Sequence, residues 1–576
     1  MPSPTVSARR APETAPDRGR DRTAGRRPRP APGVLLAAAA LPVVVVALLW
    51  PVLVSPVQAD DRYWYLLAPG DSGGSWGAVL GRVVADSDPS DGRLTPLAFL
   101  LRRLVALGVF DLSVLTGAPL ATLHSWVKVA CLVAVLAAVW AFVRAWAWRG
   151  ADGVLRRPGR WQAALVSLVV LAGLAAGAQT QNAFRNAWVA YPLLTYGAVV
   201  ATLGTVAVVL WLARRTAARR PGAVLVSAVV GLALAVALTT TYELYYVAVP
   251  AAVLALLLAP TGADGGADLR ARLVAGVPLV AGFGVLLTWA RTSIAAACAD
   301  QDCYVGTTPS LGAAAVRTTW TNLLGSVPGG GRDEAAEELA ANGLDPAVAG
   351  PGAGTLLLAA ALAACVLVLW RALAVRADRH PDGRSAHPGA TAGGRERLWS
   401  AGSQASALVR AAVVALAVAV GSAVIMSVSV QAQEVVVSLG QPYRHTVVTW
   451  TGLVLTGVLL GRAVQLRGGR AARWVPALAA LVVGALVLLS VPVNTAATRA
   501  SLASPATRAV EELHREAAVG DPTPEGDLRR CETVERVVRD WPTARAREVA
   551  LRAADATTRA YFGLPWCSEG LGLDEG

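Results

Sequence analysis

Two adjacent carboxylates, Asp60 and Asp61, follow the first long apolar run of the chain and stand before Arg62 and three aromatic residues in the segment QADDRYWYLL. A carboxylate within about 3 Å of a hydroxyl can act as a general base, and neighbouring carboxylates raise one another's pKa when they are partly buried. Adjacent carboxylates are also hard oxygen ligands, suited to a divalent cation such as Mg²⁺ or Mn²⁺. The alternative is structural, because the pair could cap the N-terminus of a short helix.

The composition indicates a membrane protein. Of the 576 residues, 55% are hydrophobic, the mean hydropathy is +0.49, and the apolar residues form runs long enough to cross about 30 Å of hydrocarbon. We therefore expect an all-α polytopic fold with about eleven transmembrane helices, near Val34–Val57, Pro119–Phe142, Trp161–Ala178, Ala187–Ala213, Ala223–Thr241, Leu244–Ala259, Leu273–Ala290, Thr355–Ala374, Ala407–Val430, Thr446–Gly461 and Val475–Val493. A turn at Tyr242–Glu243 would separate the fifth span from the sixth.

Arginine placement predicts the orientation and the division of the chain. The net charge of +13 comes from short arginine patches between apolar runs, which membrane topology explains better than a nucleic-acid partner does. The positive-inside rule puts the N-terminus in the cytoplasm, and eleven crossings put the C-terminus outside a cell membrane. The expected parts are a disordered basic N-terminus at 1–33, a membrane domain at 34–493 and an extracytoplasmic tail with two helical stretches at 494–576. Within the membrane domain we expect a large first outer loop at 58–118, a second outer loop at 291–354 and a cytoplasmic linker at 375–406.

The cysteines give a second argument about sidedness. Cys131 and Cys365 lie inside expected spans, whereas the other four lie on the side assigned as outer, where disulfides persist. We expect two local disulfides, Cys298–Cys303 and Cys531–Cys567. Four unpaired thiols are the alternative, because a sequence cannot establish pairing.

Charged residues gather in the expected outer loops. The second half of the first loop predicts a short interfacial helix with Arg102 and Arg103 on its polar side. The residues that could bind an anionic or polar substrate from this face are Arg93, Lys128, Arg185, Glu243, Arg291, Arg444 and His445. Four of them also have a structural interpretation: Glu243 as a turn residue, Lys128 as a side chain that reaches the headgroups, and Arg444 with His445 as interface anchors.

A family resemblance rests on the first loop. There the acidic pair Asp60-Asp61 continues into Tyr63, Trp64 and Tyr65, and Gly92-Arg93 follows later. With this layout the chain resembles the GT-C superfamily of integral-membrane glycosyltransferases, which use polyprenyl-phosphate sugars, and Gly92-Arg93 is like the GR of the O-antigen glucosyltransferase branch. No longer donor-site signature accompanies these residues and the expected tail is small, so the branch and the substrate stay open.

The resemblance implies an enzyme that moves a sugar from a polyprenyl phosphate to a cell-envelope glycan or lipid acceptor on the outer face of the membrane. One of Asp60 and Asp61 would be the base, and the cationic candidates would hold the phosphate of the leaving lipid. The absence of a credible GxGxxG turn or P-loop fits a donor without a nucleotide. Three alternatives remain: an O-antigen-type polysaccharide polymerase or ligase, a membrane transporter, and a structural or sensory membrane protein.

Overall fold

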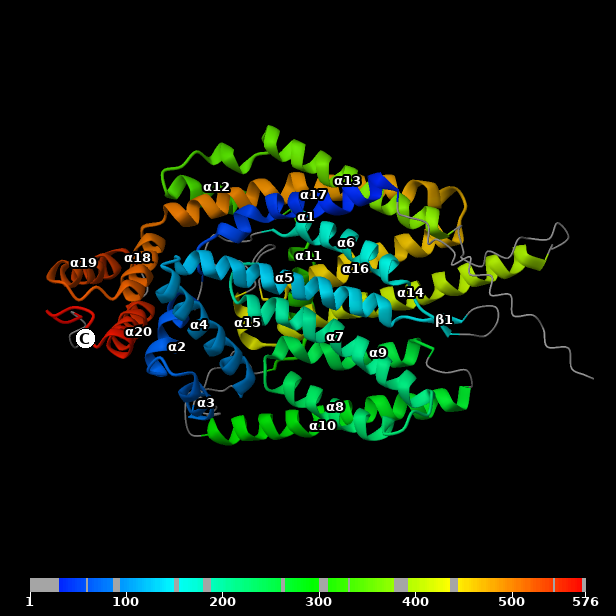
Figure 1. The fold of residues 1–576 in the computed structure, drawn as a ribbon, viewed down its shortest axis with the longest axis horizontal. Helices are drawn as coiled ribbons and strands as arrows, with labels where there is room; N and C mark the ends of the chain where they lie inside the picture. The colour runs from blue at the N-terminus through cyan, green and yellow to red at the C-terminus, as the bar shows by residue number, and fades with distance from the viewer. Residues whose placement is uncertain are drawn as a thin grey trace, which may run out of the picture.

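The structure, a computed structural model, describes residues 31–58, 61–85, 94–149, 155–179, 188–260, 265–299, 309–329, 332–377, 392–435, 444–541 and 544–571. This part of the chain is almost entirely helical (Figure 1). Its α-helices are α1 (Pro32–Val54), α2 (Asp61–Asp71), α3 (Trp76–Ala85), α4 (Pro96–Thr116), α5 (Leu120–Ala145), α6 (Arg160–Gly177), α7 (Pro192–Ala217), α8 (Ala223–Thr239), α9 (Ala248–Leu258), α10 (Gly265–Ala297), α11 (Ala313–Gly325), α12 (Arg332–Ala341), α13 (Ala353–Ala377), α14 (Ala392–Ser427), α15 (Val430–Val435), α16 (Thr446–Arg467), α17 (Arg470–Ala503), α18 (Pro505–Val519), α19 (Pro524–Asp540) and α20 (Ala544–Phe562). Two 3₁₀ helices, η2 (Glu243–Val247) and η4 (Pro346–Ala349), and a short antiparallel pair, β1 (Trp148–Arg149) with β2 (Leu155–Arg156), complete it.

The apolar helices confirm a multi-pass, all-α membrane protein. Among the described residues, nine helices are long and apolar enough to cross a membrane: α1, α5, α6, α7, α10, α13, α14, α16 and α17. The fifth and sixth expected spans are shorter apolar helices, α8 and η2 with α9, and the chain turns between Thr239 and Glu243 as expected. Together these elements form a bundle along the long axis of the molecule (Figure 1).

Small residues let neighbouring helices of the bundle approach closely. A Cβ on Gly452 of α16 would stand 2.8 Å from the Ala419 Cβ of α14 and 2.7 Å from the Ala415 carbonyl oxygen, so no larger residue fits there. One turn away, the hydroxyls of Ser422 and Thr449 lie 2.8 Å apart and hydrogen-bond across the same two helices. Such contacts stabilise helix pairs in a membrane, where lipid competes with apolar packing.

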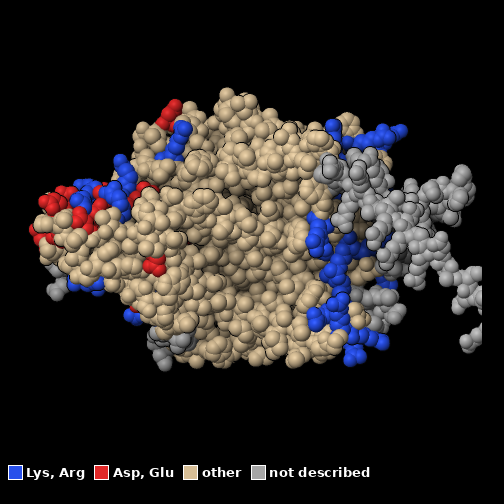
Figure 2. Space-filling model, in the orientation of Figure 1, with Lys and Arg blue, Asp and Glu red and all other residues tan. Residues whose placement is uncertain are grey.

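The two ends of the bundle differ in charge. At one end, which we call the arginine end, the face shown in Figure 2 carries blue Lys and Arg side chains without red Asp or Glu. At the opposite end, the cap end, acidic and basic side chains are mixed over helices α18–α20, and a broad uncharged band separates the two ends. An uncharged band between charged ends is the surface expected of a protein that spans a bilayer.

Helices α2, α3 and α4, which connect α1 to α5 in the chain, lie at the cap end beside α20 (Figure 1). Helix α4 corrects one expectation: it has 21 residues, and Arg102 and Arg103 do not lie on a polar, water-facing side. Both turn inward to carboxylates of α2, Arg102 to Asp61 at 2.8 Å and Arg103 to Asp71 at 3.2 Å. Apolar side chains of the same helix are exposed instead, including Leu112 at 49% and Leu115 at 80%. The reason is that buried charges need partners, whereas leucine suits a lipid-facing surface.

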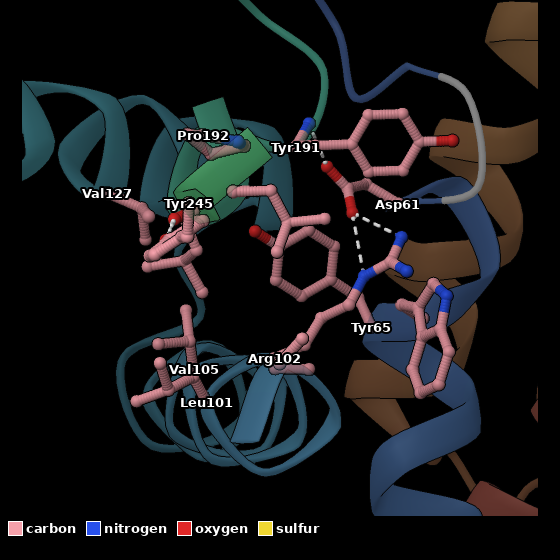
Figure 3. A pocket seen from close by; sticks show the side chains of 14 residues that line it. Asp61, Tyr65, Leu101, Arg102, Val105, Val127, Tyr191, Pro192 and Tyr245 are labelled. Atoms are coloured by element: carbon pink, nitrogen blue, oxygen red, sulfur yellow. Dashed lines mark hydrogen bonds and ion pairs between the residues drawn. The ribbon is translucent and has the colours of Figure 1, made fainter. Parts of the chain in front are cut away.

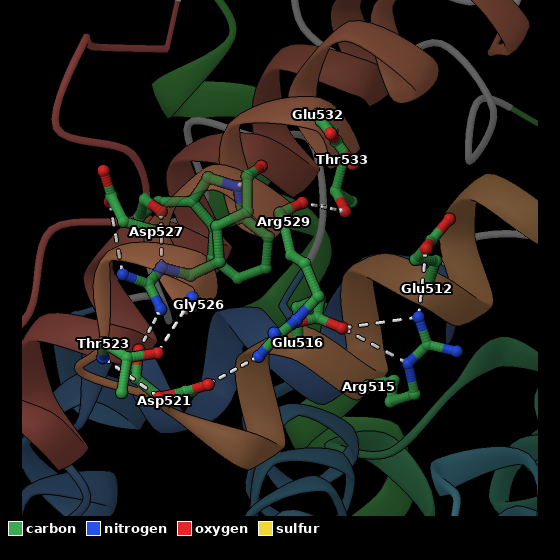
Figure 4. A network of polar contacts seen from close by, with 12 residues as sticks. Glu512, Arg515, Glu516, Asp521, Thr523, Gly526, Asp527, Arg529, Glu532 and Thr533 are labelled. Carbon is green, nitrogen blue, oxygen red and sulfur yellow. Dashed lines mark hydrogen bonds and ion pairs between the residues drawn. The ribbon is translucent and has the colours of Figure 1, made fainter.

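Helices α18, α19 and α20 form a small cap, where the expected disulfide Cys531–Cys567 is confirmed and ties α19 to the C-terminal segment. Cys298 is also disulfide-bonded, and Cys131 and Cys365 are free. A network of polar contacts runs over the cap surface (Figure 4), in which Arg529 pairs with Asp521 at 2.6 Å and with Glu516 at 3.4 Å. Exposed ion pairs contribute little individually, and the cap also has buried apolar side chains beside the disulfide, among them Val537, Trp541 and Trp566.

Three expected boundaries need correction. Helix α17 continues through Ala503, past the expected end of the last span at Val493, and the segment between the two expected tail helices is itself a helix, α19. The expected linker at 375–406 is helical in α14 from Ala392 onward. Helix boundaries depend on capping and tertiary contacts, which hydropathy does not register.

Candidate functional site

Asp61 is the meeting point of three segments at the cap end. It begins α2, is only 6% exposed, and its Oδ1 accepts hydrogen bonds from Arg102 Nε at 3.3 Å and Nη2 at 2.8 Å (Figure 3). Its Oδ2 accepts the backbone N–H of Tyr191 at 2.8 Å. The carboxylate that opens the aromatic segment thus joins α2, α4 and the start of α7.

Tyr191 holds a conformation that few residues other than glycine adopt. Its φ is +55° and its ψ is +48°, in the left-handed region, directly before Pro192 at the first turn of α7. This conformation directs its N–H to Asp61, while two guanidinium groups stand over its ring: Arg102 at 5.0 Å and Arg444 at 5.5 Å from the ring centroid. Strained residues of this kind cluster at binding and catalytic sites.

Two adjoining cavities surround this arrangement. The first, which we call the Asp61 cavity, has a volume of about 30 Å³ and is lined by Asp61, Trp64, Tyr65, Ala98, Leu101, Arg102, Val105, Ala106, Val127, Tyr191, Pro192, Leu193, Leu194 and Tyr245 (Figure 3). The second, of about 70 Å³, is lined by Thr95, Ala98, Phe99, Arg102, Tyr191, Leu194, Thr195, Tyr242 and Arg444. The two cavities share Ala98, Arg102, Tyr191 and Leu194. Their mostly apolar walls with a few convergent polar groups have the composition of small-molecule sites, although their volumes are those of a few water molecules.

A buried hydrogen-bond chain supports the wall of the Asp61 cavity. The Tyr65 hydroxyl lies 2.6 Å from Nδ1 of His124, whose Nε2 lies 3.3 Å from the Val189 carbonyl oxygen. Since a carbonyl only accepts, the Nε2–H donates to Val189 and Nδ1 accepts the tyrosine proton. His124 therefore fixes both Tyr65 and the segment that leads to Tyr191.

Of the cationic candidates predicted from sequence, Arg444 joins the site. Its Nη1 donates to the Tyr242 hydroxyl at 2.9 Å, and it lines the second cavity. Four other substrate-binding candidates, three of them basic and one acidic, line neither cavity in the part of the chain that the structure describes: Lys128, Arg291, His445 and the acidic Glu243. Lys128 is fully buried and donates to the carbonyl oxygens of Val52 and Ser55, so it satisfies the C-terminal end of α1 rather than reaching headgroups. Asp60, Arg93, Arg185 and Cys303 lie outside the described residues.

Sequence reasoning missed Arg102 and Tyr191 as site residues. A signal for Arg102 existed, because two adjacent arginines inside the apolar run LAFLLRRLVALGVF must find carboxylates or water. Tyr191 offered no comparable signal beyond the proline that follows it.

The described residues do not fit a divalent cation at Asp61. Both of its oxygens already accept N–H groups, and the Arg102 guanidinium supplies the positive charge that a metal would bring. Within the described ranges no group of three or more His, Cys, Asp or Glu side chains could hold a metal ion. The proposed chemistry therefore does not use the divalent cation that the acidic pair predicted.

No family model, no curated protein and no solved structure matches this chain. The resemblance to GT-C glycosyltransferases accordingly stays a prediction from the residues of the first loop. What the fold establishes is the broader class, a helical multi-pass membrane protein with a polar cap at one end.

Proposed function

We propose that this chain is an integral-membrane glycosyltransferase that moves a sugar from a polyprenyl-phosphate donor to a glycan or lipid acceptor. The observation that carries the proposal is the convergence of Asp61, Arg102 and Arg444 around Tyr191, in cavities beside the ends of the membrane helices. A lipid phosphate requires cationic donors at the membrane boundary, and an acceptor hydroxyl requires a carboxylate base.

The proposed roles follow from which hydrogen-bonding groups are already used. Asp61 engages Nε and Nη2 of Arg102, whereas Nη1 of Arg102 has no hydrogen bond within the described ranges and belongs to a side chain that lines both cavities. Arg102 and Arg444 hold the donor phosphate in this proposal. The Asp60-Asp61 pair supplies the base, and Asp61 also fixes the orientation of the Arg102 fork.

The proposal places the cap end outside the cell. Support comes from the arginine end, whose charge matches a cytoplasmic face, and from the Cys531–Cys567 disulfide, which suits an oxidising compartment. An export-dependent reporter fused after Gly576 should be active, and the same reporter fused after Arg470 should be inactive. The opposite pattern would contradict the proposed orientation and the side on which transfer occurs.

Membranes supplied with a lipid-linked sugar provide the test of activity. Arg444→Gln should raise KM for the donor roughly tenfold, because one charge-assisted contact to phosphate is lost. Arg317→Gln is the matched control, since Arg317 is an exposed arginine of α11 that lines neither cavity. A deletion strain with an unchanged cell-envelope glycan profile, together with no transfer by the wild-type protein, would contradict the proposal.

A further inference from the structure

A third cavity lies between the cap and the bundle, and we call it the α18 groove. It has a volume of about 690 Å³ and shares no lining residue with the Asp61 cavity. Helix α18 forms one side, and the ends of α1, α4 and α5 form the other. Its lining residues are Pro56, Val57, Ser113, Val114, Gly117, Ala118, Pro119, Leu120, Ala121, Thr507, Arg508, Val510, Glu511, Glu512, His514, Arg515, Ala518 and Val519.

The apolar part of the α18 groove stands where membrane helices end. Val57 follows α1, and Leu120 begins α5, and both are buried. Val519, which also lines the groove, is 56% exposed, and Leu115, next to the lining residue Val114, is 80% exposed. Exposed apolar side chains beside an apolar cavity at the end of a membrane bundle favour contact with lipid chains.

Two polar side chains of the groove, Thr507 and Glu511, lack partners within the described part of the chain, and a third, Arg508, forms no ion pair there. Thr507 is 2% exposed and its Oγ1 has no hydrogen-bond partner, although buried hydroxyls usually have one. Glu511 is half-buried and Arg508 is exposed one turn earlier, and neither forms an ion pair there. Arg508 attracts the carboxylate of Asp540 on α19 from beyond ion-pair distance, which leaves its guanidinium N–H groups open to a ligand. Neighbouring charges on the same helix are satisfied, since Arg515 pairs with Glu512 at 3.0 Å and with Glu516 at 3.3 Å.

The charges of Glu511 and Arg508 indicate which kind of ligand the α18 groove would bind. Burial raises the pKa of the Glu511 carboxyl, so a cation beside it would offset the cost of keeping it ionised. A phosphate is the natural partner for the guanidinium of Arg508, three residues away. A ligand that carries an ammonium group, a phosphate and an apolar chain would satisfy all parts of the groove.

We propose that the α18 groove binds a phospholipid with a primary-amine headgroup. Its ammonium group lies at Glu511, its phosphate at Arg508, and its chain against Val57, Leu120 and Val510, with the Thr507 hydroxyl bonded to a headgroup oxygen. This inference does not depend on the proposed transferase activity, because it uses none of the residues of the Asp61 cavity.

Native mass spectrometry of the purified full chain tests this proposal with three lipids of identical acyl chains: phosphatidylethanolamine, phosphatidylcholine and phosphatidylglycerol. The wild type should retain phosphatidylethanolamine best, because quaternary choline cannot donate hydrogen bonds to Glu511 and glycerol carries no positive charge. Glu511→Gln should lower retention of phosphatidylethanolamine roughly tenfold and remove the preference. Arg508→Gln should weaken all three lipids similarly, because they share the phosphate.

Glu525→Gln is the matched control, because Glu525 is an exposed carboxylate of the cap that does not line the groove. It should leave the preference unchanged. Equal retention of the three lipids by the wild type, or an undiminished preference in Glu511→Gln, would overturn the proposal. A lipid-independent dimer that excludes all three lipids would also overturn it, since a second copy of the chain would then fill the groove.

Discussion

The Asp61 cavity and the α18 groove lie at the same end of the molecule but differ in how far their charged side chains are paired within the protein. Around Asp61 the charges satisfy one another: its carboxylate accepts three N–H groups, and Arg103 pairs with Asp71. In the α18 groove, Thr507 Oγ1 has no hydrogen-bond partner and Glu511 and Arg508 form no ion pair within the described residues. The first site is preorganised by the fold, whereas the second offers groups that a ligand must satisfy.

The two arrangements should therefore respond oppositely when their carboxylates are neutralised. Removing one member of a buried ion pair leaves the other charge uncompensated and is strongly destabilising. Removing a half-buried carboxylate that has no partner eliminates a desolvation cost and breaks no bond. The unfolding free energies of the amide variants Asp61→Asn and Glu511→Gln therefore allow a direct comparison of the two regions.

Asp61→Asn should have the largest effect. It leaves Arg102 without its anionic partner and should cost roughly 3–5 kcal/mol of unfolding free energy, because both side chains are largely buried. If the proposed function holds, transfer should also fall by roughly 10²–10⁴-fold with the loss of a base. Unfolding of the purified protein in detergent and sugar transfer in membranes measure the two effects separately.

The double variant Asp61→Asn with Arg102→Gln provides the control, because it removes both charges together. It should recover part of the stability while transfer stays low. An Asp61→Asn protein as stable as the wild type would show that the ion pair does not organise this site. Full transfer by a folded Asp61→Asn protein would remove Asp61 from the proposed chemistry.

How much of this arrangement the sequence could predict depends on the range of each contact. Hydropathy is a local property, so the membrane helices and the turn before Glu243 were predicted. The site was predicted only through Asp61 and Arg444. The bonds from Asp61 reach 41 residues to Arg102 and 130 residues to Tyr191, and no short-range pattern encodes such pairings. Arg102 points inward because it forms an ion pair with Asp61, a residue that is distant in the sequence.

The disulfide tests whether the cap supports the Asp61 cavity. Cys531→Ala with Cys567→Ala removes a cross-link between residues 36 apart and should destabilise the cap by about 3–4 kcal/mol in the chain-entropy description. Helix α20 holds α2 through the bond from Thr557 Oγ1 to the Leu66 carbonyl oxygen, so looseness in the cap should reach α2. Hydrogen exchange should rise in α18–α20 and α2 but not in α14 and α16.

Cys131→Ala is the matched control, because Cys131 is a free cysteine in α5. It should leave exchange in the cap unchanged. If the double cysteine variant raises hydrogen exchange in α18–α20 but not in α2, the cap does not position α2.

His514 joins the two regions, since it lines the α18 groove and its Nε2–H donates to the carbonyl oxygen of Arg62, next to Asp61. Burial lowers the pKa of His514 from 6.5 to about 4; the hydrogen bond to the Arg62 carbonyl opposes this shift in part, and the Arg62 guanidinium adds to it. The unfolded chain therefore binds more protons between these values, so this contribution to stability is present above pH 6.5 and is lost as the pH falls toward 4.

The expected loss from His514 between pH 7 and pH 5 is about 2 kcal/mol. His514→Gln keeps a donor for Arg62 but does not titrate, so its unfolding free energy should change less over the same interval. Glu511, whose pKa is raised, has the opposite pH dependence and is present in both proteins, so the difference between them isolates the histidine. Parallel pH profiles for the two proteins would contradict a buried neutral His514.

Glu511→Gln should have the smallest effect and the opposite sign to Asp61→Asn. In lipid-free detergent at pH 7, it should leave the unfolding free energy unchanged or raise it by less than about 1 kcal/mol, because the carboxylate has no partner within the described residues and is still partly solvated. Saturating phosphatidylethanolamine should make the wild type the more stable of the two proteins. The wild type gains stability by binding the lipid, and Glu511→Gln gains less. Thermal unfolding with and without the lipid measures both states. A clear destabilisation by Glu511→Gln in lipid-free detergent would mean that Glu511 is satisfied within the protein, and the contrast with Asp61 would fail.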